Sequence, residues 1–294
     1  YDDLPYYLKS CLLYFGVYPE DYEVNSKRLI WQWIAEGFVK EEEGKALEDT
    51  AQQYLSELIS RGLVQVSSFT IDGKAKRCRV HDLLHDMILR KSKDLSFCQH
   101  IIKEIESMSS GMIRHLSIEA FSNDLLGSNE SLHTRSLLVF AKEVVTKFLE
   151  MIPTKYRLLK VLDFEDCLRC SFSVPENWEN LAHLKYLNLR GLNMPTQLPE
   201  IIGKLHNLET LDIRETDVSK LPKEFCKLRK LRHLLGDHLD LLQLKNGLGG
   251  LISLQTLRHV ELSMDDDDDD GVELIRELGK LKQLRNLSLK GVKE

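Results

Sequence analysis

Two histidines and an aspartate in the segment His81-Asp82-Leu-Leu-His85 could in principle bind a metal. Histidines at positions i and i+4 of a helix share one face and can hold zinc, with a carboxylate between them as general base. Asp82 reaches less far than the Glu of that motif, no third ligand is evident, and His81 lies at a predicted strand–helix junction. A zinc enzyme is therefore the minor alternative, and the chain is expected not to be an enzyme.

The cysteines and a run of aspartates are the other candidates for metal chemistry. Cys167 and Cys170 have the spacing of half a zinc site, but no second ligand pair lies near them. The six scattered cysteines favour reduced thiols in a cytosolic setting over a disulfide framework. Residues 265–270 are six consecutive aspartates, which predict a solvated loop. A calcium site is the sharper alternative, but the run lacks the ligand alternation of an EF-hand.

Composition narrows the function classes. The 294 residues suggest about two domains. A net charge of −6 excludes a strongly basic nucleic-acid-binding protein, so nucleic acid is not an expected partner. No apolar run reaches the roughly 18 residues that a membrane span needs, and no signal peptide is visible. Because the chain starts at Tyr1, we expect a fragment.

Leucine forms a repeat in the second half of the chain. Of the 53 leucines, 33 lie beyond residue 150. The template L-x-x-L-x-x-L-x-L places its third leucine at positions 162, 187, 211, 234, 257 and 287, at intervals of 25, 24, 23, 23 and 30 residues. Weaker copies precede them at residues 115–118 and 136–139. Pro175, Pro199 and Pro222 each mark a turn before a helical or 3₁₀ return segment. This period predicts a leucine-rich-repeat solenoid, in which neighbouring repeats share one core.

Alternation along each repeat strand separates core residues from surface residues. Leu187 and Leu189 should point inward, because successive strand side chains face opposite ways. The residues between them and at the equivalent positions of the next repeat should then line the concave face. We predict a protein-binding surface there, of mixed charge, formed by Tyr186, Asn188, Arg190, Thr210, Asp212 and Arg214.

The first hundred residues do not follow the repeat. Helices are predicted over residues 4–15, 27–36 (with Ser26 as its cap and Gly37 as its end), 47–60, and from Asp82 onward. Asp72-Gly73 between two apolar runs predicts a hairpin. Three helices with a hairpin wing make a winged-helix arrangement. Its acidic stretch from Glu41 to Asp49 argues against DNA binding, and Trp31 and Trp33 are expected to be packing residues.

Particular segments of this first part resemble a known family. Residues 4–22 carry the pattern LP…LKSCLLYF…YPEDY, and residues 30–38 continue it with IWQWIAEGF. Val80-His81-Asp82 is similar to the family's Met-His-Asp motif, with Val in place of Met. The chain thus resembles plant coiled-coil-type nucleotide-binding leucine-rich-repeat (NB-ARC-LRR) disease resistance proteins, and the repeats follow where that family has them.

The resemblance implies an intracellular immune receptor. The winged-helix part would close over ADP or ATP in the full-length switch, where His81 would contact the ADP phosphate. Val80 and Asp82 would support the motif, Asp82 by capping the helix or organising the junction. The repeats would recognise a pathogen effector or a guarded host protein, or restrain activation. The location would be cytoplasmic, with nuclear or membrane-associated positions open for the full-length protein.

The expected organisation is therefore an α/β chain of two domains. Residues 1–104 form the winged-helix part of a nucleotide-binding module, and residues 105–294 form the start of a leucine-rich-repeat horseshoe, truncated at its end. A leucine-rich-repeat interaction scaffold unrelated to immunity is the alternative, because a fold does not determine a function. The expected partners are the nucleotide-binding domain of the same protein and a pathogen effector or guarded host protein.

Nucleotide binding by the chain alone is expected to be weak. The chain contains no G-x-x-x-x-G-K-[ST] loop, whose amides and lysine hold phosphates in this class of protein. Titration of the purified chain with ADP should give no saturation in the low micromolar range. Low-micromolar ADP affinity would contradict this prediction.

Overall fold

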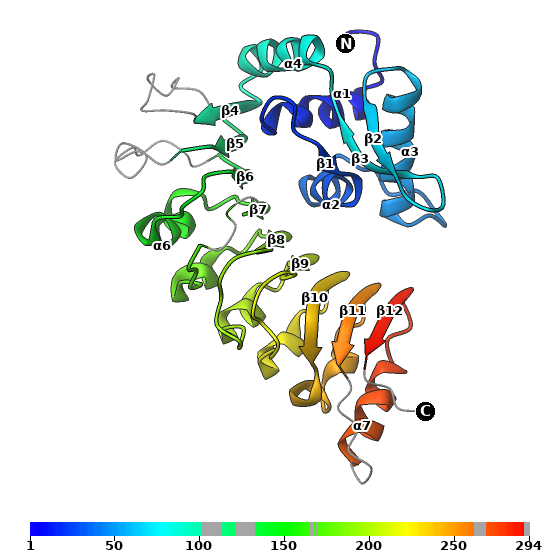
Figure 1. The fold of residues 1–294 in the computed structure, drawn as a ribbon, viewed down its shortest axis with the longest axis vertical. Coiled ribbons are helices and arrows are strands. Elements are labelled where there is room, and N and C mark those ends of the chain that lie inside the picture. The colour runs from blue at the N-terminus through cyan, green and yellow to red at the C-terminus, as the bar shows by residue number, and fades with distance from the viewer. Residues whose placement is uncertain (102–112, 121–132, 165–166, 168–169, 262–268, 291–294) are drawn as a thin grey trace.

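The computed structural model describes residues 1–101, 113–120, 133–164, 167, 170–261 and 269–290. A helical unit with a small antiparallel sheet is followed by a curved ladder of parallel strands (Figure 1). The predicted order, a winged-helix domain followed by a leucine-rich-repeat solenoid, is confirmed. Residues 265–268 of the aspartate run lie outside the described residues. Among the described residues, no helix is both long and apolar enough to cross a bilayer.

The winged-helix domain holds helices and strands close to the predicted ranges. Its elements are α1 (Tyr6–Leu13), η1 (Tyr14–Val17), β1 (Val24–Asn25), α2 (Ser26–Glu36), α3 (Leu47–Ser60), β2 (Gln65–Phe69), β3 (Ala75–Arg79) and α4 (Asp82–Asp94). The hairpin of β2 and β3 turns at Asp72-Gly73 as predicted. The two-residue strand β1, which is too short to show a period in the sequence, pairs with β3 and completes the sheet.

Helix α2 differs from its prediction at the start. Asn25, not Ser26, caps it, because the Asn25 side chain accepts hydrogen bonds from the backbone N–H groups of Lys27 and Arg28. Ser26 is the first helical residue and is buried. The predicted end is confirmed, since Gly37 adopts the left-handed conformation with φ of 85°.

Nine strands form the repeat sheet, in the order of the chain. The strands are β4 (Cys98–Ile101), β5 (His115–Ile118), β6 (Ser136–Val139), β7 (Val161–Asp163), β8 (Tyr186–Asn188), β9 (Thr210–Asp212), β10 (His233–Asp240), β11 (Thr256–Glu261) and β12 (Asn286–Lys290). One leucine of each strand from β5 to β12 pairs in register with the next: Leu116, Leu137, Leu162, Leu187, Leu211, Leu234, Leu257 and Leu287. The six predicted repeats and both weaker copies are thus confirmed as one continuous ladder.

The outer side of the curve carries the return segments. The 3₁₀ helices η2 (Glu176–Asn180), η3 (Glu200–Lys204) and η4 (Lys223–Lys227) each follow a proline, as predicted. Further segments on this side are α6 (Thr146–Lys155), η5 (Leu242–Leu244), η6 (Leu248–Gly250) and α7 (Asp269–Leu278). Neighbouring segments pack so closely that a Cβ at Gly203 would lie 2.5 Å from the Cβ of Glu224.

Strand β4 links the two domains. It lies within residues 1–104, the range predicted for the winged-helix domain, yet it pairs in parallel with β5 and is the first strand of the repeat sheet. The repeat ladder therefore begins only a few residues after α4 ends at Asp94.

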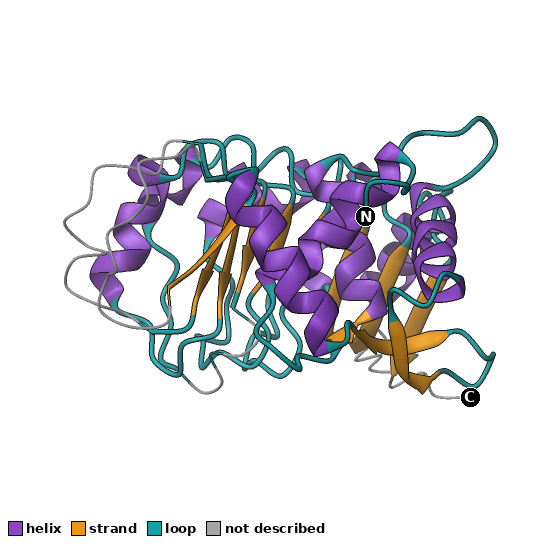
Figure 2. Ribbon diagram, turned by 90° about the horizontal axis from the view of Figure 1, so that it is seen from above, coloured by secondary structure: helices purple, strands orange, loops and turns teal. Residues whose placement is uncertain are grey.

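The sheet separates two apolar cores. The repeat leucines and the outer segments form one core, and the helices of the first domain form the other. Figures 1 and 2 show the helices that lie on the two sides of the strand ladder. The helices of the winged-helix domain lie inside the curve of the strands. The concave face of the first repeats is thus covered by the chain itself.

Equivalent leucines of the ladder should differ in their contribution to stability. Leu211 is fully buried, whereas Leu287 in the last strand is 43% exposed. Leu211→Ala should lower the free energy of unfolding by about 3 kcal/mol, because it leaves a cavity in the shared core. Leu287→Ala, the matched control, should cost less than about 1 kcal/mol because its side chain is half exposed. Urea unfolding measures both, and equal losses would contradict the prediction.

Candidate functional site

The concave face of the repeats binds the winged-helix domain through apolar and polar contacts. Leu138 on β6, Val161 on β7 and Tyr186 on β8 belong to the apolar core of the winged-helix domain and not to the core of the repeats. Each is at most 1% exposed. These strands are therefore buried on both faces, and the polar groups between them must find partners within the chain.

Asp163 is the centre of the first polar cluster. Its carboxylate accepts hydrogen bonds from Arg28 Nε at 2.8 Å and Gln32 Nε2 at 2.6 Å, both on α2, and from Asn188 Nδ2 at 3.1 Å on β8. Arg28 is 5% exposed, and Asp163 is fully buried. The Tyr18 hydroxyl in turn donates to Gln32 Oε1. A buried charge of each sign is thus paired across the domain contact.

Glu36, at the end of α2, is the centre of a second cluster. Ser136 Oγ donates to its carboxylate, His115 Nδ1 lies 3.5 Å from Oε1, and Lys160 Nζ donates to its backbone carbonyl at 3.0 Å. Burial by itself would raise the pKa of the Glu36 carboxyl. The neighbouring His115, Ser136 and Lys160 outweigh that effect, so the pKa is held below its ordinary value and the group is charged.

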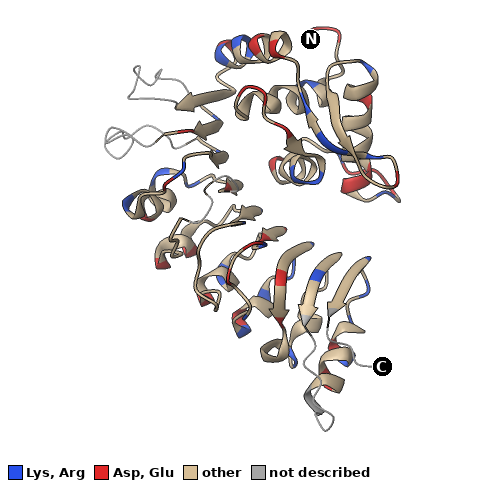
Figure 3. Ribbon diagram, viewed as in Figure 1, with Lys and Arg blue, Asp and Glu red and all other residues tan. Residues whose placement is uncertain are grey.

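Glu48, in the first turn of α3, is the centre of a third cluster farther along the curve. It accepts hydrogen bonds from Arg232 Nη2 at 2.7 Å and from His233 Nε2 at 2.8 Å. The ring of His233 also packs against Trp31 with centroids 4.8 Å apart. Burial lowers the pKa of His233, so a neutral ring donates its Nε2 proton to the Glu48 carboxylate. Figure 3 shows the acidic residues of the first domain facing the repeats here.

The predicted partner surface is largely occupied by this contact. Tyr186 and Asn188 are at most 1% exposed, and Thr210 and Asp212 are each 3% exposed. These four are therefore not open to another protein in this arrangement, because the winged-helix domain covers their strands. The other two predicted residues lie at the rim: Arg190 pairs with Glu215, and Arg214 pairs with Asp212.

Sequence reasoning missed most of the contact residues. A partial signal existed for Asp163, since it occupies the same register position as Asn188 and Asp212. No comparable signal exists for Arg28 or Glu48. The sequence pattern of an amphipathic helix is the same whether its polar residues face water or another domain.

The motif residue His81 lies on an exposed part of the winged-helix domain. Its Nδ1 accepts the Leu83 N–H at 3.4 Å, so His81 itself caps α4. The prediction that Asp82 caps this helix is wrong. Asp82 is the first helical residue, where the helix dipole stabilises its negatively charged carboxylate. Val80 is buried at 6% exposure. With Nδ1 accepting, the ring carries its proton on Nε2.

The candidate metal ligands are engaged in other contacts. His85 is buried, and its Nε2 lies 3.1 Å from the Tyr18 carbonyl oxygen. The Cys167 and Cys170 thiols donate to the carbonyls of Val139 and Lys142. In the part of the chain that the structure describes, no three His, Cys, Asp or Glu side chains gather as a metal site would require.

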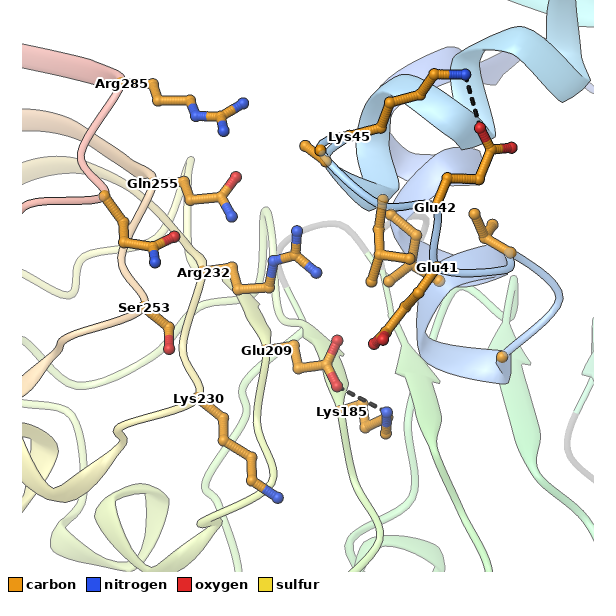
Figure 4. A pocket seen from close by; sticks show the side chains of 17 residues that line it. Glu41, Glu42, Lys45, Lys185, Glu209, Lys230, Arg232, Ser253, Gln255 and Arg285 are labelled. Carbon is orange, nitrogen blue, oxygen red and sulfur yellow. Dashed lines mark hydrogen bonds and ion pairs between the residues drawn. The ribbon is translucent and has the colours of Figure 1, made fainter.

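A cleft of about 700 Å³ lies between the α2–α3 loop and the repeats. Figure 4 shows the side chains that line it. Basic side chains of successive repeats, including Arg232 and Arg285, face Glu41 and Glu42 across it. Most of its charges are already paired: Lys45 with Glu42, Lys185 with Glu209, and Arg232 with Glu48. The cleft is therefore close to electrically balanced.

Removal of the Asp163 carboxylate should weaken the domain contact strongly. Asp163→Leu leaves Arg28 buried without its charge partner, which should cost about 3–5 kcal/mol of unfolding free energy. In the double variant with Arg28→Met, much of that loss should be recovered, because no unpaired charge remains. Urea unfolding of the single and double variants measures the coupling.

A matched control is Glu179→Leu, which removes a carboxylate from the exposed ion pair with Lys204 on the outer side of the repeats. It should cost no more than about 1 kcal/mol. If Asp163→Leu were no more costly than this control, the Asp163 cluster would not hold the domains together.

Comparison with known proteins agrees with the order of the two domains along the chain. The family model described as Disease resistance protein Winged helix domain matches residues 17–88, and the one described as Leucine-rich repeat region matches residues 133–294. The chain is 32% identical over 266 residues to the putative disease resistance RPP13-like protein 3 of Arabidopsis thaliana, covering 88% of this chain and 30% of that protein.

Two further relatives come from crop plants. The chain is 34% identical over 243 residues to the ToMV resistance protein Tm-2(2) of Solanum lycopersicum, and 34% identical over 240 residues to the disease resistance protein Pik-2 of Oryza sativa subsp. japonica. Each match covers 80% of this chain, but only 28% and 23% of the respective relative. The chain belongs to the family of plant NB-ARC-LRR disease resistance proteins and carries that family's winged-helix domain followed by its leucine-rich-repeat region.

Proposed function

We propose that this chain is the regulatory part of an intracellular plant immune receptor, in which the repeats hold the winged-helix domain in a resting position. The observation that carries the proposal is the winged-helix domain lying in the concave face of the repeats, bound through the Asp163, Glu36 and Glu48 clusters. The role is regulated binding and not catalysis. Its expected location is the cytoplasm.

The chemistry of the contact suits a reversible switch. A buried ion pair contributes little net stability, because both charges regain hydration when they separate. Arg28 with Asp163 is a buried pair of this kind, and Arg232 with Glu48 is a partly buried one. A docked and a separated arrangement can then differ by only a few kcal/mol, so a ligand that prefers one of them can shift the population.

The exposed surface around His81 supports a second contact, with a nucleotide-binding module that holds ADP or ATP. An Nε2–H group at the N-terminus of the 13-residue helix α4 can donate to a phosphate oxygen, and the helix dipole favours an anion there. Leu83, in the first turn of α4 beside His81, is 77% exposed, which suits a covering module. The nucleotide would supply the phosphate oxygen that accepts a hydrogen bond from His81. Val80 and Asp82 would keep His81 in position for this contact.

The repeats also offer a partner surface beyond the winged-helix domain. Arg190 and Arg214 remain partly exposed at the rim of the contact. A pathogen effector or a guarded host protein that bound this rim would compete with the winged-helix domain for the concave face. Binding of the effector or the guarded host protein would then release the winged-helix domain from the repeats.

The proposal predicts that loosening the contact raises resting immune output. In a chimera where this chain replaces the matching segment of the tomato Tm-2(2) protein, Asp163→Leu should increase cell death in leaves several-fold without an effector. The reason is that the variant destabilises the docked arrangement and leaves the His81 surface intact. Leaf ion leakage measures the effect, with protein level followed by immunoblot.

The unaltered chimera and its Glu179→Leu variant are the controls, and both should remain silent. A silent Asp163→Leu chimera that accumulates to the control level would contradict the restraining role of the repeats.

A further inference from the structure

A second pocket lies between the wing and the repeats, and Trp31, which packs on His233, is part of its lining. Its volume is about 440 Å³. The start of α2 and the β2–β3 hairpin form one wall, and side chains of β10, β11 and β12 form the other. Both domains therefore contribute to it.

Positive charge dominates the lining of this pocket. Among the described residues that line it, the cations are Lys27, Lys74, Lys76, Arg214 and Arg258, and the carboxylate is Asp72. Asp72 lies 3.7 Å from Lys74, and Asp212 accepts from Arg214 Nε at 2.9 Å. Among the described side chains, no carboxylate lies within 4 Å of the remaining three cations, Lys27, Lys76 and Arg258. Three uncompensated charges thus face one space.

The cations of the pocket repel one another. Partial burial lowers the pKa of Lys27, and the charges of Arg258, Lys74 and Arg214 lower it further, against the opposing effect of Asp72. A protein gains no stability from gathering like charges in a pocket. An anion that entered the pocket would remove this repulsion.

We propose that the pocket binds a small polyphosphate anion that bridges the winged-helix domain and the repeats. Lys27 and Lys76 approach it from the first domain, and Arg258 approaches it from β11. The guanidinium of Arg258 can bind phosphate oxygens in a bidentate manner, and the lysines act as point charges. A ligand with two or more phosphate groups can meet cations on both walls at once.

The size and the charge balance of the pocket select this class of ligand. A volume of about 440 Å³ admits a compact molecule and excludes a nucleic-acid duplex. The cleft of Figure 4 has five cations as well, but the carboxylates of Glu41, Glu42 and Glu209 line it and Glu48 pairs with Arg232, so only one positive charge is in excess there. The excess of positive charge is therefore larger in the pocket at the wing, where three cations lack a carboxylate partner.

A ligand held by both domains would strengthen their contact. Any molecule that binds only the docked arrangement stabilises it, by an amount that grows with the logarithm of its concentration above its Kd. This inference depends on the observed contact of the two domains and not on the proposed immune role. A test of anion binding can therefore fail while the proposed immune role holds, and the reverse is also true.

The test is calorimetric titration of the purified chain with inorganic triphosphate. Saturable binding of one triphosphate per chain is expected, weaker at 0.2 M than at 0.05 M salt because the contact is electrostatic. Arg258→Gln and Lys76→Gln should each weaken the affinity about tenfold, since each removes a charge-assisted contact. Lys223→Gln, which removes an exposed lysine on the outer side of the repeats, is the matched control and should not change it.

Thermal unfolding gives a readout that a merely structural role would not produce. Without triphosphate, Arg258→Gln should raise Tm slightly, because it relieves repulsion. With saturating triphosphate, the unaltered chain should gain Tm and the variant should gain much less.

Three results would overturn the proposal. The first is the absence of saturable binding beyond that of sulfate at equal ionic strength. The second is triphosphate affinity that is equal in Arg258→Gln and Lys223→Gln. The third is tighter binding of an acidic peptide or a single-stranded oligonucleotide than of triphosphate, which would assign the pocket to a macromolecule.

Discussion

The buried carboxylate of Asp163 constrains the arrangement of the two domains. A charged group removed from water must be paired and hydrogen-bonded, and Arg28, Gln32 and Asn188 meet that requirement together. Two of these partners come from α2 of the winged-helix domain. The carboxylate is therefore satisfied only when that helix lies against β7 and β8, so docking and desolvation of this side chain occur together.

The same requirement explains why the repeat sheet has a core on each side. Parallel strands with both faces covered are common where helices pack on both sides of a sheet. Here the outer segments cover one face, and the winged-helix domain covers the other along the first repeats. The apolar contribution of Leu138, Val161 and Tyr186 holds the domains together, and the polar clusters decide in which position they are held.

Three features of the contact lie at different places along the curve. The Asp163 and Glu36 clusters lie under α2, the Glu48 cluster follows at β10, and the basic pocket lies beyond it under the wing. His81 is exposed at the start of α4, apart from these clusters. A module bound at His81 and an anion bound under the wing would thus act on the same domain through different surfaces, and either could alter how firmly the repeats hold it.

Local patterns in the sequence predict the repeat strands, the wing and the main helices of the first domain, because the forces that form these elements act between near neighbours. The leucine period predicts the strands, Asp72-Gly73 predicts the wing, and Gly37 ends α2 as expected. The short strand β1 and the cap at Asn25 were beyond such reasoning, since competing local choices differ by little free energy. The contact between the domains depends on pairs such as Arg28 with Asp163, which are 135 residues apart. Only the tertiary structure decides that the polar concave face meets a domain and not water, because a polar side chain satisfies its hydrogen bonds in either environment.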